Sequence, residues 1–106
     1  MTIDSTKPHR INIAEFPRLS EFARGYLHQD LVPEHGSPLQ AALRYVNDLS
    51  AAEQKQAAAE AFRFRGIIHD WRNAEVNEAV AALGGSWNFV VKSELFEVLQ
   101  TIERGH

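Results

Sequence analysis

Two imidazoles and two carboxylates fall within a short stretch of the sequence, at His28, Asp30, Glu34 and His35. Such side chains are common metal ligands and acid–base groups, so the cluster predicts a metal site or proton-transfer chemistry. His28 and Asp30 lie two residues apart near a predicted helix end, where they do not share a face. In the alternative, His28 favours the C-terminal end of the helix dipole and Asp30 orders the loop. We favour this structural role and expect no bound metal.

The remaining candidates for catalysis are weak. His69 and Asp70 are adjacent residues of a predicted helix, so their side chains point about 100° apart, and no serine nucleophile motif accompanies them. The chain has no cysteine, which excludes thiolate nucleophiles, disulfides and Cys-ligated metals. The Gly84-Gly85-Ser86 segment suits a helix C-terminus better than a phosphate loop. We therefore expect no enzyme and no cofactor.

Basic and aromatic residues alternate in one segment. Arg63, Arg65 and Arg72 surround Phe62, Phe64 and Trp71, a composition also found in nucleic-acid-binding surfaces. The net charge of −3 offers no such footprint. We expect the aromatic side chains to be core and the arginines to form a solvated rim, with no direct binding of nucleic acid.

The acidic charge is concentrated near the end of the chain. Residues 1–74 hold nine basic and nine acidic side chains, whereas residues 75–106 hold two and five. The glutamates concerned are Glu75, Glu78, Glu94, Glu97 and Glu103. They predict either an acidic surface complementary to a basic protein or simply a solvated helix face.

Helical spacing of apolar residues dominates the sequence. A first helix is expected from Pro17 to about Tyr26, with a loop over residues 31–36. Ser37-Pro38 begins a second helix. Its expected apolar stripe is Leu39, Leu43, Val46 and Leu49.

The second half predicts three more helices. Ser50 and Glu53 form a capping box for a long helix with Ala57, Ala61, Phe64, Ile68 and Trp71 on one face, and Gly66 leaves its continuity open. Asn73 is expected to cap a fourth helix that ends at Gly84-Gly85, and Ser93 a final helix that ends at Gly105. Residues 86–92 alternate like a strand but have no partner strand, which favours an extended connector.

These elements predict an all-α fold, a single compact domain of about five helices with short loops. A length of 106 residues suits one domain. We expect residues 1–14 to be an N-terminal extension and residues 15–106 to form the domain. No signal-peptide pattern or run of about 18 apolar residues is present, so a cytoplasmic protein without membrane contact is expected.

Three motifs follow one another in the first half: Phe16-Pro17 at the start of the first helix, Tyr26-Leu27-His28-Gln29-Asp30 at its end, and Gly36-Ser37 before the second helix. Over about residues 14–53 this pattern resembles the immunity proteins of bacterial contact-dependent growth inhibition (CDI) systems. The resemblance implies an all-helical cytoplasmic protein that binds and blocks one cognate toxin domain, commonly a nuclease, without catalysis.

The same resemblance assigns the recurring motif residues to the scaffold, because recognition of different toxins should use parts that differ. Toxin contacts are therefore expected at Glu75, Glu78, Glu94 and Glu97, with the corner near Asp48 as a further contact. Two alternatives stay open. The first is a metal-binding module or metal-dependent enzyme that uses the His28 cluster, and the second is a helical adaptor unrelated to toxins. The sequence leaves the oligomeric state open.

Overall fold

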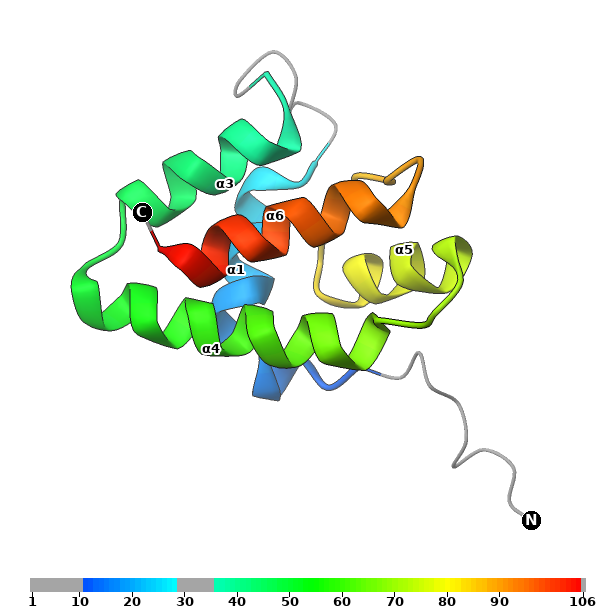
Figure 1. Ribbon diagram of the computed structural model, residues 1–106, viewed down its shortest axis with the longest axis horizontal. Coiled ribbons are helices and arrows are strands. Elements are labelled where there is room, and N and C mark those ends of the chain that lie inside the picture. Colours follow the sequence, from blue (N-terminus) through cyan, green and yellow to red (C-terminus); the bar gives the residue numbers. More distant parts are fainter. Residues whose placement is uncertain (1–10, 29–35, 106) are drawn as a thin grey trace.

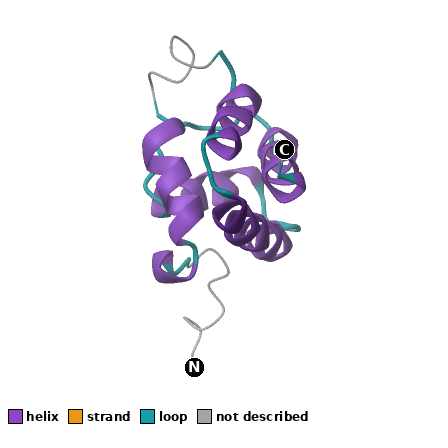
Figure 2. Ribbon diagram, turned by 90° about the vertical axis from the view of Figure 1, so that its left-hand side faces the viewer, coloured by secondary structure: helices purple, strands orange, loops and turns teal. Residues whose placement is uncertain are grey.

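The computed structural model describes residues 11–28 and 36–105. Within these ranges the chain forms five α-helices and a short 3-10 helix, η2 (Ile13–Glu15), and no β-strand (Figures 1 and 2). The α-helices are α1 (Pro17–Tyr26), α3 (Pro38–Asn47), α4 (Ala51–Ile68), α5 (Asn73–Ala82) and α6 (Lys92–Arg104). The predicted all-α domain of about five helices is confirmed.

Helix α6 lies between α3 and α4 and packs on both. Helix α1 crosses behind this layer and contacts α3 and α4, while α5 lies towards the C-terminal end of α4 (Figure 1). Because α6 is flanked on two sides, only a narrow strip of its surface reaches solvent.

Each of these helices contributes apolar side chains to one core. Phe16, which precedes α1, meets Phe64 of α4 edge to face, with ring centroids 5.4 Å apart. The five side chains predicted for the inner face of α4 are all buried. The helix continues through Gly66 without interruption, although Trp71 lies beyond its end. A void of about 10 Å³ among the core side chains leaves no room for a buried ligand.

Short-range capping signals are confirmed where both partners lie within one turn. The Ser37 hydroxyl accepts the Gln40 backbone N–H at 3.2 Å, and Ser50 and Glu53 form the predicted reciprocal box. At the end of α5, Gly84 adopts φ = 107°, a conformation that favours glycine.

Two predicted caps are wrong. Helix α5 begins at Asn73 itself, after Arg72, and the Arg72 backbone N–H donates to Glu75 Oε1 at 3.1 Å. The Asn73 amide instead donates to the Phe89 carbonyl at 3.1 Å. Ser93 is the second residue of α6, which begins one residue earlier because Val91 holds the extended N-cap conformation.

The predicted apolar stripe of α3 is also corrected. Leu39 and Leu43 are 40% and 50% exposed. Val46 is buried as predicted and Leu49 packs partly against the core, but the rest of the buried face of α3 is made by Ala41, Ala42 and Tyr45. Alanines allow neighbouring helices to approach closely, and the Tyr45 hydroxyl finds polar partners on α1, so a face of smaller and amphipathic residues is buried in preference to the leucines.

Residues 86–91 form no β-strand, as predicted, although Lys92 already belongs to α6. The Ser86 and Trp87 N–H groups donate to the Leu27 carbonyl at 2.8 and 3.1 Å and attach this connector to the end of α1. Asn77 holds it: its amide oxygen accepts the Phe89 backbone N–H at 2.8 Å, and its amide nitrogen donates to the Phe89 carbonyl at 2.9 Å. These two bonds replace the missing partner strand and keep the Phe89 ring in the core.

Of the expected N-terminal extension, residues 1–10 lie outside the described part of the chain. Its last residues enter η2, which the Asn12 side chain caps by accepting the Ala14 N–H at 3.0 Å. Arg63 of α4 donates to the Glu15 carbonyl at 2.8 Å and lies over the Phe16 ring. The domain thus begins to pack before Pro17.

A candidate protein-binding surface along α3

Glu94 and Glu97 lie one turn apart on the exposed strip of α6. With Ser37, Pro38, Leu39 and Val98 they line a pocket of about 180 Å³ between α6 and the start of α3. Neither carboxylate forms an ion pair within residues 11–28 and 36–105. Two unneutralised charges therefore flank an exposed leucine.

The predicted glutamates of α5 have a different environment. Glu75 is half-buried and accepts the Arg72 N–H at the start of its helix, so its carboxylate has a structural role. Glu78 is exposed on the same helix. The pocket lined by Glu94 and Glu97 includes neither of these two residues.

Glu103, the fifth glutamate of the acidic segment, is neutralised within the domain. Arg65 Nη2 of α4 donates to Glu103 Oε1 at 2.9 Å, and the guanidinium Nε binds the other oxygen. This bidentate pair links α4 to α6 and contradicts the expectation of a merely solvated arginine. The hydrogen bond to Glu103 raises the pKa of Arg65.

The aromatic residues near these arginines differ in burial. Phe64 and Trp71 are buried as predicted, whereas Phe62 is 63% exposed, which corrects the prediction that it belongs to the core. Phe62 points away from the core because it lies two residues from both Glu60 and Phe64, which face inward. Its ring lies beneath the Arg65 guanidinium, 5.7 Å from the ring centroid.

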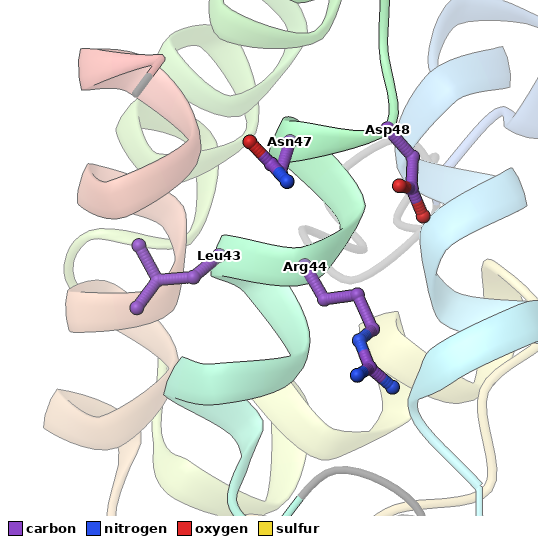
Figure 3. A pocket seen from close by; sticks show the side chains of 4 residues that line it. All are labelled: Leu43, Arg44, Asn47 and Asp48. Atoms are coloured by element: carbon purple, nitrogen blue, oxygen red, sulfur yellow. The ribbon is translucent and has the colours of Figure 1, made fainter.

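Beyond Leu39, the outer face of α3 continues as a hollow of about 580 Å³ lined by Leu43, Arg44, Asn47 and Asp48 (Figure 3). Leu43 points towards α6, whereas Arg44 and Asp48 point towards α1. Leu39 and Leu43 are separated by one helical turn, so they share a face. Leu39 and Leu43 therefore form an apolar ridge along α3, with charged side chains at both of its ends.

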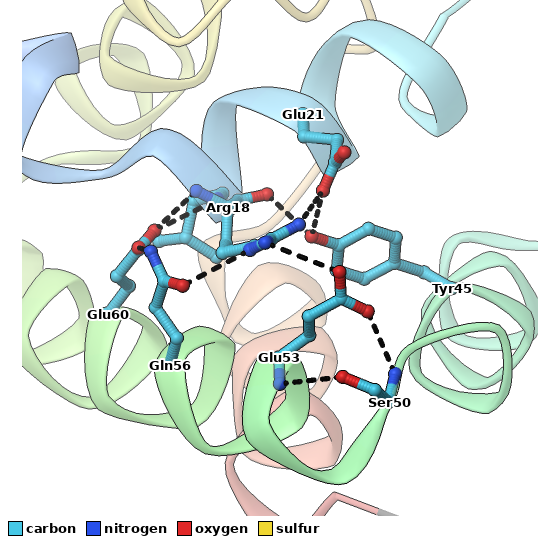
Figure 4. Close-up of polar contacts among 8 residues, drawn as sticks. Arg18, Glu21, Tyr45, Ser50, Glu53, Gln56 and Glu60 are labelled. Carbon is cyan, nitrogen blue, oxygen red and sulfur yellow. Dashed lines mark hydrogen bonds and ion pairs between the residues drawn. The ribbon is translucent and has the colours of Figure 1, made fainter.

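At the far end of α3, side chains from α1, α3 and α4 form a polar network (Figure 4). Arg18 binds Glu21 Oε1 at 3.0 Å, Gln56 Oε1 at 3.3 Å and Glu53 Oε2 at 3.4 Å. The hydrogen bond to Glu21 raises the pKa of Arg18. The hydrogen bonds from Ser50 lower the pKa of Glu53.

Glu60 is the deepest member of this network, at 3% exposure. One oxygen, Oε1, accepts the backbone N–H groups of Arg18 and Leu19 at 2.8 and 3.0 Å. The first turn of α1 has no side-chain cap of its own, so this α4 carboxylate satisfies two of its unpaired donors. No local pattern in the sequence predicts this role, because the two partners lie 42 and 41 residues away along the chain.

The tyrosines complete the network. The Tyr45 hydroxyl lies 2.9 Å from both the Arg18 carbonyl oxygen and Glu21 Oε1, and the Tyr26 hydroxyl donates to Asp48 Oδ2 at 3.4 Å. Burial and the bond to Glu21 raise the pKa of Tyr45 well above its usual range. Burial and Asp48 raise the pKa of Tyr26. Both hydroxyls therefore stay protonated and act as donors at neutral pH.

The predicted metal cluster falls largely outside the described residues. This applies to Asp30, Glu34 and His35, and also to the motif residue Gln29. His28 is described, and its Nε2 lies 3.0 Å from the Gly25 carbonyl oxygen at the end of α1, as expected for a residue that completes a helix terminus. Across residues 11–28 and 36–105, no group of three or more His, Asp or Glu side chains could hold a metal ion.

The other motif residues hold structural positions where they are described. Phe16 and Pro17 begin α1, Gly36 has φ = 90°, and Ser37 caps α3. His69, the second candidate for catalysis, is exposed just after the end of α4 and lies near the Phe96 ring, with centroids 6.5 Å apart.

Comparisons with known proteins return no match: no family model, no curated protein and no solved structure resembles this chain. None of the helices in the described part of the chain is long and apolar enough to span a membrane.

Proposed function

We propose that this protein binds and neutralises a cognate toxin domain in the cytoplasm, as the immunity proteins of CDI systems do, and that it catalyses no reaction. The observation that carries the proposal is the α3–α6 surface. There two exposed leucines, Leu39 and Leu43, adjoin two unneutralised carboxylates, Glu94 and Glu97. The resemblance over residues 14–53 supports the class of partner.

An exposed apolar ridge with charged neighbours is the composition of many transient protein interfaces. A standard interface covers about 800 Å² on each partner, and a few well-packed side chains dominate its affinity. Leu39 and Leu43 are the apolar anchors of this surface, since they already stand out from α3 and lose little freedom on binding. The partner surface should therefore offer apolar contacts along one helix face.

The carboxylates determine which charge the partner surface should carry. Glu94 and Glu97 favour a basic surface and accelerate its approach at low salt. Nucleases present such a surface because they bind phosphates, so carboxylates placed on it compete with the nucleic acid. Glu78, which is exposed on α5, stays a predicted contact, whereas Glu75 contributes less because its carboxylate caps α5.

The direct test uses the gene immediately upstream, which should encode a large secreted protein with a C-terminal toxin domain. Co-expression of the present chain should rescue cells from that domain. The purified pair should bind tightly, with an affinity that falls as salt rises.

Two variants locate the surface. Leu43→Asp and the double charge reversal Glu94→Lys, Glu97→Lys should each weaken toxin binding at least about tenfold, and the second should also flatten the salt dependence. Asp70→Lys, an exposed carboxylate at the end of α4, serves as the matched control and should bind as the unaltered chain does. Failure to rescue refutes the function, whereas rescue with unchanged binding by both variants refutes the surface.

A further inference from the structure

A cavity of about 280 Å³ lies where α1, α3 and the start of α4 meet, at the opposite end of α3 from Glu94 and Glu97. Its lining residues are Arg18, Glu21, Tyr26, Tyr45, Asp48, Leu49 and Glu53. Pockets for whole small molecules usually measure about 300 to 1,000 Å³. This cavity is smaller, so a single side chain from another protein suits it better.

Hydrogen-bond acceptors outnumber donors in the cavity. The single Tyr45 hydroxyl proton faces two acceptors at equal distance, the Arg18 carbonyl oxygen and Glu21 Oε1. Asp48 receives one long bond, from Tyr26 to Oδ2, and its Oδ1 accepts none from the described residues. A ligand rich in donors and without acceptors would correct this imbalance.

The charge and shape of the lining also favour a ligand that is rich in hydrogen-bond donors. Three carboxylates, Glu21, Asp48 and Glu53, face one guanidinium, so the lining is net negative. Tyr26 and Tyr45 form an aromatic wall, with ring centroids 5.4 Å apart in an edge-to-face arrangement. Guanidinium groups carry five donors and no acceptor, keep their charge at any physiological pH and stack on tyrosine rings.

We propose that this cavity receives an arginine side chain of the partner protein, with its guanidinium bound to Asp48 against the Tyr26–Tyr45 wall. Arg18 is already occupied by Glu21, Glu53 and Gln56, so Asp48 is the carboxylate open to a new cation. The inference rests on the proposed function in so far as it assigns the arginine to a protein partner.

The test uses the isolated chain and a probe in place of the partner. Nα-acetyl-arginine amide is titrated into the ¹⁵N-labelled chain, and amide shifts are followed by NMR. Saturable shifts should centre on Tyr26, Asp48 and Leu49. The neutral isostere Nα-acetyl-citrulline amide should bind about tenfold more weakly, because it lacks the charge that strengthens the hydrogen bonds.

Asp48→Asn should weaken binding of the arginine probe about tenfold. Because Asp48 is exposed and makes one long side-chain bond, the spectrum of this variant should otherwise match that of the unaltered chain. Asp70→Asn removes an equal charge at the end of α4 and should leave probe binding unchanged. Absence of saturable shifts, equal binding of citrulline, or full binding by Asp48→Asn overturns the proposal.

The experiments distinguish a failure of the proposed function from a failure of the proposed arginine site. A chain that neutralises the toxin but does not bind the arginine probe retains the proposed function and loses this site. A chain that binds the probe through Asp48 but does not rescue cells retains the site and loses its toxin partner.

Discussion

Removal of the Glu60 side chain should destabilise the domain more than removal of any exposed carboxylate. Its Oε1 accepts two backbone donors from the first turn of α1, and Leu19 is buried. Each unsatisfied buried donor costs about 1–3 kcal/mol, and loss of a helix cap costs about 1 kcal/mol. We expect Glu60→Ala to lower the free energy of unfolding by about 3 kcal/mol, because the Arg18 donor is only partly buried.

Glu60→Gln separates the charge from the hydrogen bonds. The glutamine keeps a carbonyl oxygen in the same place, so both backbone donors stay satisfied. The losses are the attraction between a carboxylate and the positive end of α1 and the hydrogen bond that Gln56 Nε2 donates to Glu60 Oε2 at 3.2 Å, together worth about 1–2 kcal/mol. Lys55→Ala is the control on α4 and should cost no more than about 0.5 kcal/mol, because Lys55 is exposed.

Urea unfolding at neutral pH, followed by circular dichroism, gives the three free energies. Thermal scans should place the midpoint of Glu60→Ala about 15 °C below that of the unaltered chain, since 1 kcal/mol shifts a domain of this size by about 4–8 °C. Equal losses for Glu60→Ala and Glu60→Gln would refute the capping role of the side chain. A loss below about 1 kcal/mol for Glu60→Ala would do the same.

Three further perturbations test local contacts. The Ser50 bonds hold the pKa of Glu53 below its ordinary value of 4.5, so the stability that Glu53 contributes is present above that pH and disappears as the pH falls through the lowered value. The stability difference between the unaltered chain and Glu53→Gln should therefore shrink on acidification, and a pH-independent difference would contradict it. Asn77→Ala leaves the Phe89 N–H without an acceptor, whereas Asn73 still donates to the Phe89 carbonyl, so the variant should cost about 1–2 kcal/mol, with faster exchange of the Phe89 amide proton as the direct readout. Gly84→Ala should cost about 1–2 kcal/mol in urea unfolding because φ is 107° there, whereas Gly66→Ala, with open space around its Cβ position, should be neutral or stabilising.

The sequence revealed the features whose partners lie within one helical turn. Ser37 with Gln40, and Ser50 with Glu53, depend on hydrogen bonds that a helix start always offers, so residue type and spacing were sufficient. The glycine end of α5 follows the same logic. Where a side chain had a distant alternative, the local rule failed. Asn73 was available to cap α5 but binds the Phe89 carbonyl, 16 residues away.

The pattern of apolar residues also did not reveal which face of α3 packs against the core. In α3 the sequence offers two faces with helical spacing, one rich in leucine and one rich in alanine with Tyr45. The second is buried because small residues let α6 and α1 approach, and because the Tyr45 hydroxyl reaches Arg18 and Glu21. Hydrophobicity alone predicts that the leucines are buried. Leu39 and Leu43, which are now proposed for binding, were therefore expected in the core.

The candidate site depends on which carboxylates the fold uses internally. Glu60, Glu53, Glu75 and Glu103 each accept hydrogen bonds that stabilise a helix end or join two helices. Residue type cannot separate these from Glu94 and Glu97, because all are glutamates on helices and only their tertiary partners differ. The acidic segment predicted from charge counting therefore contracts to the few carboxylates without an internal role.

Exposed carboxylates lie at both ends of α3. Glu94 and Glu97 line the pocket beside Ser37 at the start of α3, and Asp48 lies at the end of α3. The ten residues of α3 span about 15 Å, and the exposed leucines occupy the interval between the charges. A single protein surface of standard size covers that length, whereas a small molecule does not. The spacing of charge and apolar surface along α3 therefore favours one protein partner, with basic groups at both ends of an apolar contact, over two separate ligands.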